Sequence, residues 1–139
     1  MNPETINYNS DLPDEKSYFG LFETTGWNKD YKINSVQLIK TLSKSWFWIC
    51  AYHNNELVGS GRIVSDGLLH AVIFDLIVKP CYQRIGIGSK IMTKLLEHCY
   101  KKQIKDIQLF SAAGKKGFYL KQGFVSRPQN APGMEIKKI

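Results

Sequence analysis

The part of the sequence that most constrains the fold is residues 73–99, an apolar run followed by a glycine-rich turn and an amphipathic segment. Residues 73–78, Ile-Phe-Asp-Leu-Ile-Val, have the composition of a strand, and Pro80 follows them. The turn at residues 83–88 reads Gln-Arg-Ile-Gly-Ile-Gly. Apolar residues at positions 91, 92, 95, 96 and 99 then fall on one side of a helix. The segment therefore predicts a strand, a tight turn and a helix in succession.

This order of elements is typical of a phosphate-binding backbone. Glycines allow the main chain to approach a ligand closely, and the first N–H groups of a helix have no acceptor within it. A dinucleotide-binding loop would need a third glycine where this chain has Ile91, and the Gly-Lys-Ser/Thr of a P-loop does not occur in the sequence. We therefore expect a different phosphate-bearing ligand close to Gly88.

Two motifs together identify a family. The turn matches the pattern Gln/Arg-x-x-Gly-x-Gly/Ala, and residues 118–124 read Phe-Tyr-Leu-Lys-Gln-Gly-Phe. With both motifs at this separation, the chain resembles the GCN5-related N-acetyltransferases. The resemblance implies that acetyl-CoA is a co-substrate whose pyrophosphate lies on the turn. It also implies that the pantetheine arm pairs with the main chain of Ile77 and Val78, as an added strand would.

The resemblance and the chemistry of the turn together define a candidate set for acetyl-CoA. The residues of this set are Ile77, Val78, Gln83, Arg84, Ile85, Gly86, Ile87, Gly88, Ser89 and Lys121. No metal is expected, because the sequence has neither a Cys-x-x-Cys motif nor a Cys/His cluster. We expect Cys50 and Cys99 in the core and Cys81 near the surface.

Tyr119 is the predicted general acid. Acetyl transfer from a thioester to an amine requires a neutral amine, donors for the developing oxyanion and a proton for the departing thiolate. A phenol with a pKa of about 10 is protonated at neutral pH and can supply that proton. The resemblance places the family's acid tyrosine at this position. Packing against Phe118 and Phe124 is the alternative explanation for the residue.

Asp75 is an acid within an otherwise apolar strand. A buried carboxylate costs several kcal/mol unless it is paired, so its presence needs a reason. It could orient the acceptor ammonium or take its proton, and it is therefore a candidate catalytic residue. It could equally be the structural partner of a backbone N–H or a neighbouring lysine. Arg62 is a candidate for lining the acceptor pocket, whereas a lone His70 is more typical of the surface or the core.

The remaining pattern predicts an α+β fold. We expect one helix from Asp11 to about Gly26 with Pro13 near its first turn, and a second over residues 34–43. Asn34 or Ser35 would cap the second helix. Its inward-facing residues are expected to be Val36, Ile39 and Leu42. Strands are expected at residues 5–8, 47–53, 57–65, 69–78, 105–111, 123–127 and 134–138, with a short helix at 115–122.

The connection from strand 69–78 through a helix to strand 105–111 predicts a parallel pair. The expected architecture is a mixed, mostly antiparallel sheet of six to seven strands with helices on both faces. The resemblance adds that the parallel pair splays apart at the centre of the sheet. A chain of 139 residues suits a single domain spanning residues 1–139.

Composition and net charge limit the kinds of partner that the chain is expected to bind. The chain is 43% hydrophobic, without an apolar run near the ~20 residues that span a bilayer and without a signal-peptide pattern at its start. We therefore expect a cytoplasmic protein with no membrane partner. A net charge of +7 would suit nucleic acid, but the lysines are dispersed and form no basic stripe with aromatic residues. Nucleic acid is therefore not an expected partner, and a ligand with several phosphates explains the charge near the two motifs.

These observations predict an N-acetyltransferase that moves an acetyl group from acetyl-CoA to the primary amine of a small molecule by direct attack. The alternatives are a non-catalytic acyl-CoA sensor and an acetyltransferase acting on protein amines. The resemblance also leaves a homodimer open. The identity of the acceptor and the general base do not follow from the sequence.

Overall fold

The structure is a computed structural model that describes residues 5–137. The chain divides into two compact units, one ending at Leu109 and the other beginning at Phe110, and each is described by itself. A single domain over residues 1–139 stays a prediction.

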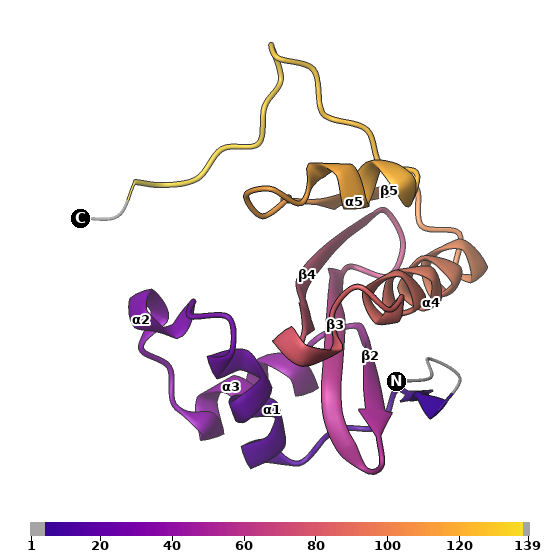
Figure 1. Cartoon of the computed structure of the whole chain (residues 1–139). Coiled ribbons are helices and arrows are strands. Elements are labelled where there is room, and N and C mark those ends of the chain that lie inside the picture. The colour runs from indigo at the N-terminus through magenta and orange to yellow at the C-terminus, as the bar shows by residue number, and fades with distance from the viewer. Residues whose placement is uncertain (1–4, 138–139) are drawn as a thin grey trace. The chain divides into compact units, whose positions relative to one another are not determined.

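The first unit contains a mixed sheet (Figure 1). Its strands are β1 (Asn7–Asn9), β2 (Phe47–His53), β3 (Glu56–Ser65), β4 (His70–Val78) and β5 (Asp106–Leu109). They lie side by side in sequence order, antiparallel except for β4 and β5, which are parallel. Helix α4 (Ile87–Lys101) makes the crossover between these two strands. The predicted α+β class is confirmed, with five strands in the described residues instead of six to seven.

Two predicted strands in the second unit are wrong. Residues 123–127 and 134–137 form no strand, and Lys138 lies outside the described residues. A strand needs a neighbour for its hydrogen bonds, and β-type composition alone does not provide one. Val125, Met134 and Ile136 are 84%, 86% and 92% exposed. Within the described chain, the parallel pair therefore lies at the edge of the sheet and not at its centre.

Three helices precede β2: α1 (Glu15–Glu23), α2 (Asn28–Tyr31) and α3 (Ser35–Ser43). Asp14 caps α1, and its carboxylate accepts the Ser17 N–H at 3.0 Å. Pro13 directly precedes this cap and so lies near the first turn of the helix, as predicted. The short helix α2 was not predicted, because four residues carry no recognisable apolar period.

Helix α3 begins with a capping box. The Asn34 side chain accepts the Gln37 N–H at 2.8 Å, and the Gln37 side chain accepts the Asn34 N–H at 3.1 Å. Of the two caps considered from the sequence, Asn34 and Ser35, the structure has Asn34. The buried residues are Leu38 and Leu42, four apart on one side of the helix, while Val36 on the other side is 53% exposed. The prediction that Val36 points inward was wrong.

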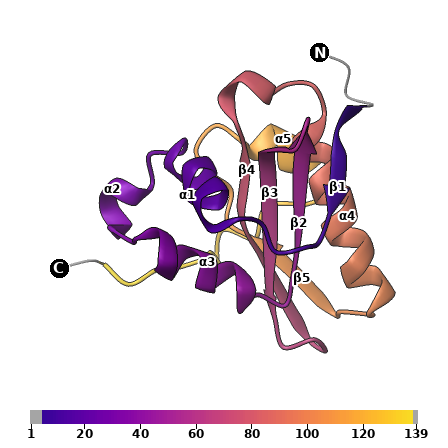
Figure 2. The same cartoon turned by 90° about the horizontal axis from the view of Figure 1, so that it is seen from below.

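The helices of the first unit cover both faces of its sheet, with α1 and α3 on one side and α4 on the other (Figure 2). Glycines on β3 allow the close approach of α4. A Cβ placed on Gly61 would lie 3.0 Å from the side chains of Ile91 and Leu95, and one on Gly59 would lie 3.1 Å from Ile91. Because side chains alternate along a strand, Ser60 and Arg62 project to the opposite face, toward α1.

Cys50 and Cys99 are buried and Cys81 is exposed, as predicted. Among residues 5–137, the structure has no helix with the length and apolar character that crossing a bilayer requires.

Candidate active site

The central feature of the site is a bulge in β4. Strand pairing shifts between Arg62↔Phe74 and Ser60↔Ile77, so two residues of β4 lie opposite Gly61 on β3. One of the two is Asp75, whose φ is +53°, in the left-handed region. Aspartate enters this region more readily than most residues, but the conformation still needs contacts that hold it. The bulge therefore gives Asp75 a backbone position that regular strand alternation would not.

An ion pair holds the Asp75 side chain. The Arg62 Nε–H donates to Asp75 Oδ2 at 2.7 Å, and the two side chains are only 18% and 20% exposed. Arg62 Nη1 also donates to Ser45 Oγ at 3.2 Å, and the guanidinium lies over the Phe74 ring, 5.7 Å from its centroid. The partner of Asp75 is thus an arginine and not the lysine or backbone N–H considered from the sequence. This pairing explains how the carboxylate is accommodated in an apolar strand.

The far half of β4 has an edge that β5 does not cover. The parallel pairing joins residues 70–73 of β4 to residues 106–109 and extends no further within the described chain. The Lys79 N–H donates to Val58 O on β3 at 2.8 Å. Because successive residues turn their main-chain groups to opposite edges of a strand, Ile77 also faces β3, and Val78 faces the edge that β5 leaves uncovered. Of the two predicted main-chain contacts to pantetheine, Val78 has the suitable direction.

The turn after β4 is tied to the end of the strand. The Gln83 side-chain amide donates to Val78 O at 2.9 Å, so this carbonyl already has a partner while the Val78 N–H is directed outward. A short 3-10 helix, η2 (Pro80–Tyr82), links the two residues. Gln83 therefore positions the turn relative to the strand edge, a role that the motif alone did not predict.

The glycine turn opens directly into α4. Gly86 has φ +94° and is the N-cap of the helix, and Arg84 before it has φ +65°. The first helical bond runs from Lys90 N–H to Gly86 O at 3.0 Å, so the helix offers no acceptor to the N–H groups of Ile87 and Gly88. A Cβ placed on Gly86 would meet no atom within 4 Å. An open space thus lies beside donors at the positive end of a helix, which fits the predicted pyrophosphate.

The β2–β3 hairpin supports the segment that leads into this turn. His53 Nδ1 and the Tyr82 hydroxyl are hydrogen-bonded at 3.0 Å, and Lys79 Nζ pairs with Glu56 Oε2 at 3.2 Å. Neither contact was predicted, because both join residues more than twenty positions apart. The hairpin end therefore fixes the position of η2, from which the turn starts.

Tyr119 belongs to the second unit, on helix α5 (Lys116–Lys121). Its ring packs edge-on against Phe118 and Phe124, with centroids 5.1 and 6.2 Å away. Burial raises the pKa of Tyr119 above its ordinary value of 10, so the phenol stays protonated at neutral pH. The structure thus shows the packing that was the alternative explanation, together with the protonation state that a general acid needs. The acid role stays a prediction, as does the contact of Lys121 with acetyl-CoA.

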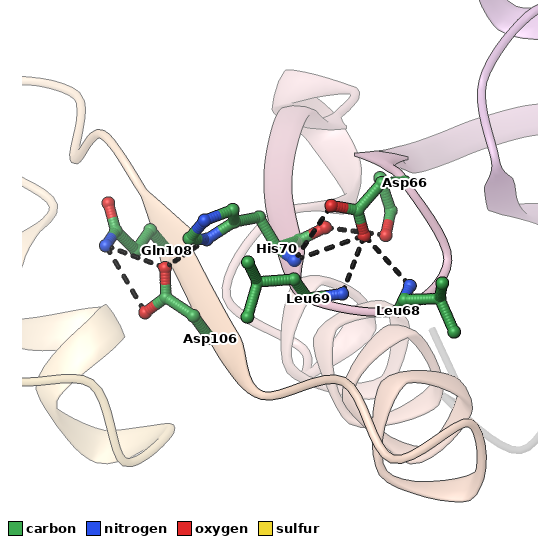
Figure 3. A network of polar contacts seen from close by, with 7 residues as sticks. Asp66, Leu68, Leu69, His70, Asp106 and Gln108 are labelled. Atoms are coloured by element: carbon green, nitrogen blue, oxygen red, sulfur yellow. Dashed lines mark hydrogen bonds and ion pairs between the residues drawn. The ribbon is translucent and has the colours of Figure 1, made fainter.

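A separate polar network joins the beginnings of β4 and β5 (Figure 3). His70 Nδ1 contacts Asp106 Oδ2 at 2.8 Å, and the Gln108 amide donates to the same carboxylate at 3.1 Å. The Asp66 carboxylate accepts hydrogen bonds from the N–H groups of Leu68, Leu69 and His70. These hydrogen bonds lower the pKa of Asp66, and the one from Leu68 has the largest effect. His70 is exposed, so of the surface and core positions considered from the sequence it takes the surface one. The network is at the opposite end of β4 from Val78 and secures the parallel pair.

Comparison with known proteins establishes the family. Residues 21–135 match the family model described as the acetyltransferase (GNAT) domain. The chain belongs to this family. The family that the two sequence motifs indicated is therefore confirmed.

Named relatives of this GNAT chain are N-acetyltransferases. It is 33% identical over 118 residues to an uncharacterized N-acetyltransferase of Porphyra purpurea, covering 82% of this chain and 66% of that protein. It is 36% identical over 87 residues to GCN5-related N-acetyltransferase 1, chloroplastic, of Arabidopsis thaliana, covering 63% of this chain and 44% of that protein. A GNAT-family acetyltransferase structure from Streptococcus pneumoniae superposes with a TM-score of 0.80 at 30% identity, covering 96% and 98% of the two chains.

The GNAT chain spans about half the length of the first two curated relatives, 44% and 47%. Within residues 5–137, no three His, Cys, Asp or Glu side chains are grouped as metal ligands. The residues that the structure brings together are those of the strand edge, the turn and the start of α4, with Asp75 and Arg62 on the same strand pair.

Proposed function

We propose that the protein transfers an acetyl group from acetyl-CoA to the primary amine of a small molecule by direct attack. The observation that carries this proposal is the uncovered edge of β4, which leads through Gln83 into the open turn at the start of α4. This arrangement offers strand-type hydrogen bonds to an extended arm, followed by N–H donors for a diphosphate.

Acetyl-CoA binding is divided between these two parts. The pyrophosphate would accept hydrogen bonds from the N–H groups of Ile87 and Gly88, at the positive end of the α4 dipole. Arg84 and Lys90 would add positive charge next to the phosphates. The pantetheine arm would pair with Val78 along the strand edge. The side chains of Ile85, Ser89 and Lys121 complete the candidate set from the sequence.

The chemical step needs no covalent intermediate on the protein. The amine loses a proton, and its lone pair attacks the thioester carbonyl carbon, so that a C–N bond forms and the C–S bond breaks. The departing thiolate takes a proton from the Tyr119 hydroxyl, and the phenolate regains one from solvent. The proposal requires Tyr119 to lie against the thioester sulfur when acetyl-CoA is bound.

A small acceptor is favoured over a protein by the enclosure of Asp75. Its side chain is only 20% exposed, beside the packed guanidinium of Arg62. A compact amine can reach such a carboxylate with less rearrangement than a folded protein surface can. A cytoplasmic location is part of the same proposal, although two relatives are named chloroplastic.

The proposal is tested by incubating the full chain with acetyl-CoA and separate amines, namely an amino sugar, a polyamine, an amino acid, an arylamine and a lysine-containing peptide. We expect thiol release that depends on the amine, with a product heavier by one acetyl group in mass spectrometry. Omitting the amine is the control. Tight CoA binding without turnover of any amine would support the sensor, and acetylation of the peptide alone would support a protein acceptor.

A further inference from the structure

The segment between β4 and the glycine turn has no anchor in the hydrophobic core. None of the three residues of η2 is buried. The hydrogen bonds of η2 run from the Tyr82 N–H to Lys79 O at 2.9 Å and from the Gln83 N–H to Pro80 O at 3.3 Å. Bonds of this 3-10 type have poorer geometry than those of an α-helix. Contacts from other elements are therefore needed to hold the segment in place.

The backbone after η2 needs the same support. Arg84 has φ +65°, a left-handed conformation that costs free energy in a residue with a side chain. Such a conformation persists only where the surrounding contacts hold it. The Gln83 side-chain amide supplies one contact, to Val78 O. This bond joins the turn to the end of its own strand and does not connect it to another element.

The end of the β2–β3 hairpin provides a contact from another element. His53 and Glu56 are paired across the two strands, so their side chains project to the same face. Asn54 and Asn55 lie between them with φ of +49° and +65°, as the two-residue type I′ turn of a hairpin requires. The tight turn therefore presents the His53 and Glu56 side chains in fixed positions.

These two side chains hold the two ends of η2. His53 Nδ1 and the Tyr82 hydroxyl are hydrogen-bonded at 3.0 Å, and their rings meet edge to face with centroids 5.6 Å apart. Lys79 Nζ donates to Glu56 Oε2 at 3.2 Å. Because Glu56 is 53% exposed, water screens this ion pair, whereas the His53 contact is partly buried. The hydrogen bond between His53 and Tyr82 is therefore the stronger of the two contacts.

We propose that His53 and Tyr82 are positioning residues for acetyl-CoA. The pantetheine arm would pair at Val78, before η2, and the diphosphate would bind at Ile87 and Gly88, after it. One ligand reaches both places at once only while η2 keeps its position, and the hydrogen bond secures that position. This inference rests on the proposed function, because it assumes that the ligand lies along the strand edge and the turn.

The strength of the hydrogen bond sets the size of the expected effect. Without it the turn populates other positions, and the apparent affinity for CoA falls with the fraction that stays competent to bind. A hydrogen bond within a protein favours the state that contains it by roughly 3- to 10-fold. Neither residue takes part in the proposed chemical step. The KM for acetyl-CoA should therefore rise by this factor while kcat changes little.

The test measures the Kd of CoA by isothermal titration, and kcat and KM by thiol release. Tyr82→Phe removes only the hydroxyl, and His53→Phe keeps a ring without a polar atom. We expect each variant to raise the Kd of CoA and the KM for acetyl-CoA roughly 3- to 10-fold. The kcat and the KM for the amine should stay within about twofold of wild type. The double variant should bind CoA no more weakly than the weaker single variant, because both changes remove the same bond.

Two further variants separate positioning from a general effect on the fold. His53→Asn places an amide near the site of Nδ1, can bond the Tyr82 hydroxyl and should recover most of the affinity. Tyr100→Phe, at a tyrosine that is 64% exposed on α4, is the matched control and should bind CoA as wild type does. All titrations are made well below the Tm of each variant, where a loss of stability alone leaves the protein folded and the Kd unchanged.

The outcomes distinguish this inference from the proposed function. If wild type binds CoA and both single variants stay within about twofold of its Kd, the inference is overturned and the proposed function stands. Effects of the two changes that add in the double variant, or a fall in kcat in place of a rise in KM, also overturn it. If wild type binds CoA but acetylates no amine, the proposed transfer fails, and weaker CoA binding by the two single variants still supports the inference. If wild type binds no CoA, both fail.

Discussion

Tyr119→Phe is expected to lower kcat by roughly 10²–10⁴-fold, the usual contribution of general acid catalysis, and to leave the KM for acetyl-CoA nearly unchanged. The substitution removes the phenolic proton but keeps the ring that packs against Phe118 and Phe124. Without this proton the departing thiolate must leave as an anion or take a proton from water. The change should therefore affect the step in which the C–S bond breaks, and not the binding of either substrate.

Steady-state thiol release with the best amine acceptor measures this effect, and thermal unfolding checks that the variant is folded. Burial raises the pKa of Tyr119 above about 10, the ordinary pKa of a tyrosine. The phenol therefore stays protonated until the pH exceeds that value. The wild-type kcat should therefore show no loss from this group below that pH. A Tyr119→Phe enzyme with kcat within about threefold of wild type would show that the residue is a packing tyrosine.

Arg62→Met is expected to lower the free energy of unfolding by about 2–4 kcal/mol, somewhat less than the loss of a partner in a fully buried ion pair. Methionine keeps much of the apolar contact with Phe74 but removes the charge that faces Asp75 at 2.7 Å. The carboxylate would then remain mostly enclosed, without a cation, on a residue already held at φ +53°. Urea unfolding followed by circular dichroism measures the change.

Asp75→Asn is the matched control for this prediction. Asparagine has the same shape, tolerates the left-handed conformation and can still accept the Arg62 Nε–H. It should cost less stability than Arg62→Met. Combining the two substitutions should cost less than the sum of the single changes, because no unpaired carboxylate remains. If Arg62→Met loses under about 0.5 kcal/mol, the ion pair does not hold the bulge.

Local patterns predicted much of the first unit. The aromatic and β-branched run over residues 47–53 coincides with β2, and the apolar spacing after Gly88 predicted α4. The cap of α3 was narrowed to Asn34 or Ser35, and Asn34 takes the position, because capping needs only the residues of its own turn. In each case the controlling interactions lie within a few residues or repeat with a regular period.

The site depended on contacts that a local pattern does not contain. The bulge at Asp75 is a register shift against β3, and register arises from pairing between strands. Arg62 is separated by 13 positions from Asp75 and by 17 from Ser45, the two residues that accept hydrogen bonds from its guanidinium. The prediction of strands near Val125 and Ile136 was wrong because a local apolar pattern does not supply a pairing partner. In the described structure no strand lies beside these residues.

The central claim is that the turn between β4 and α4 binds the diphosphate of CoA. Isothermal titration of CoA into wild type and Gly86→Ala tests it most directly. Gly86 has φ +94° and open space beside it, so a methyl group there strains the turn without a clash. Gly26→Ala, with φ +78° and equally open space between α1 and α2, is the matched control for that strain. We predict that wild type and Gly26→Ala bind CoA alike and that Gly86→Ala binds at least about 10-fold more weakly. Equal binding by all three proteins, or no binding by wild type, would contradict the claim.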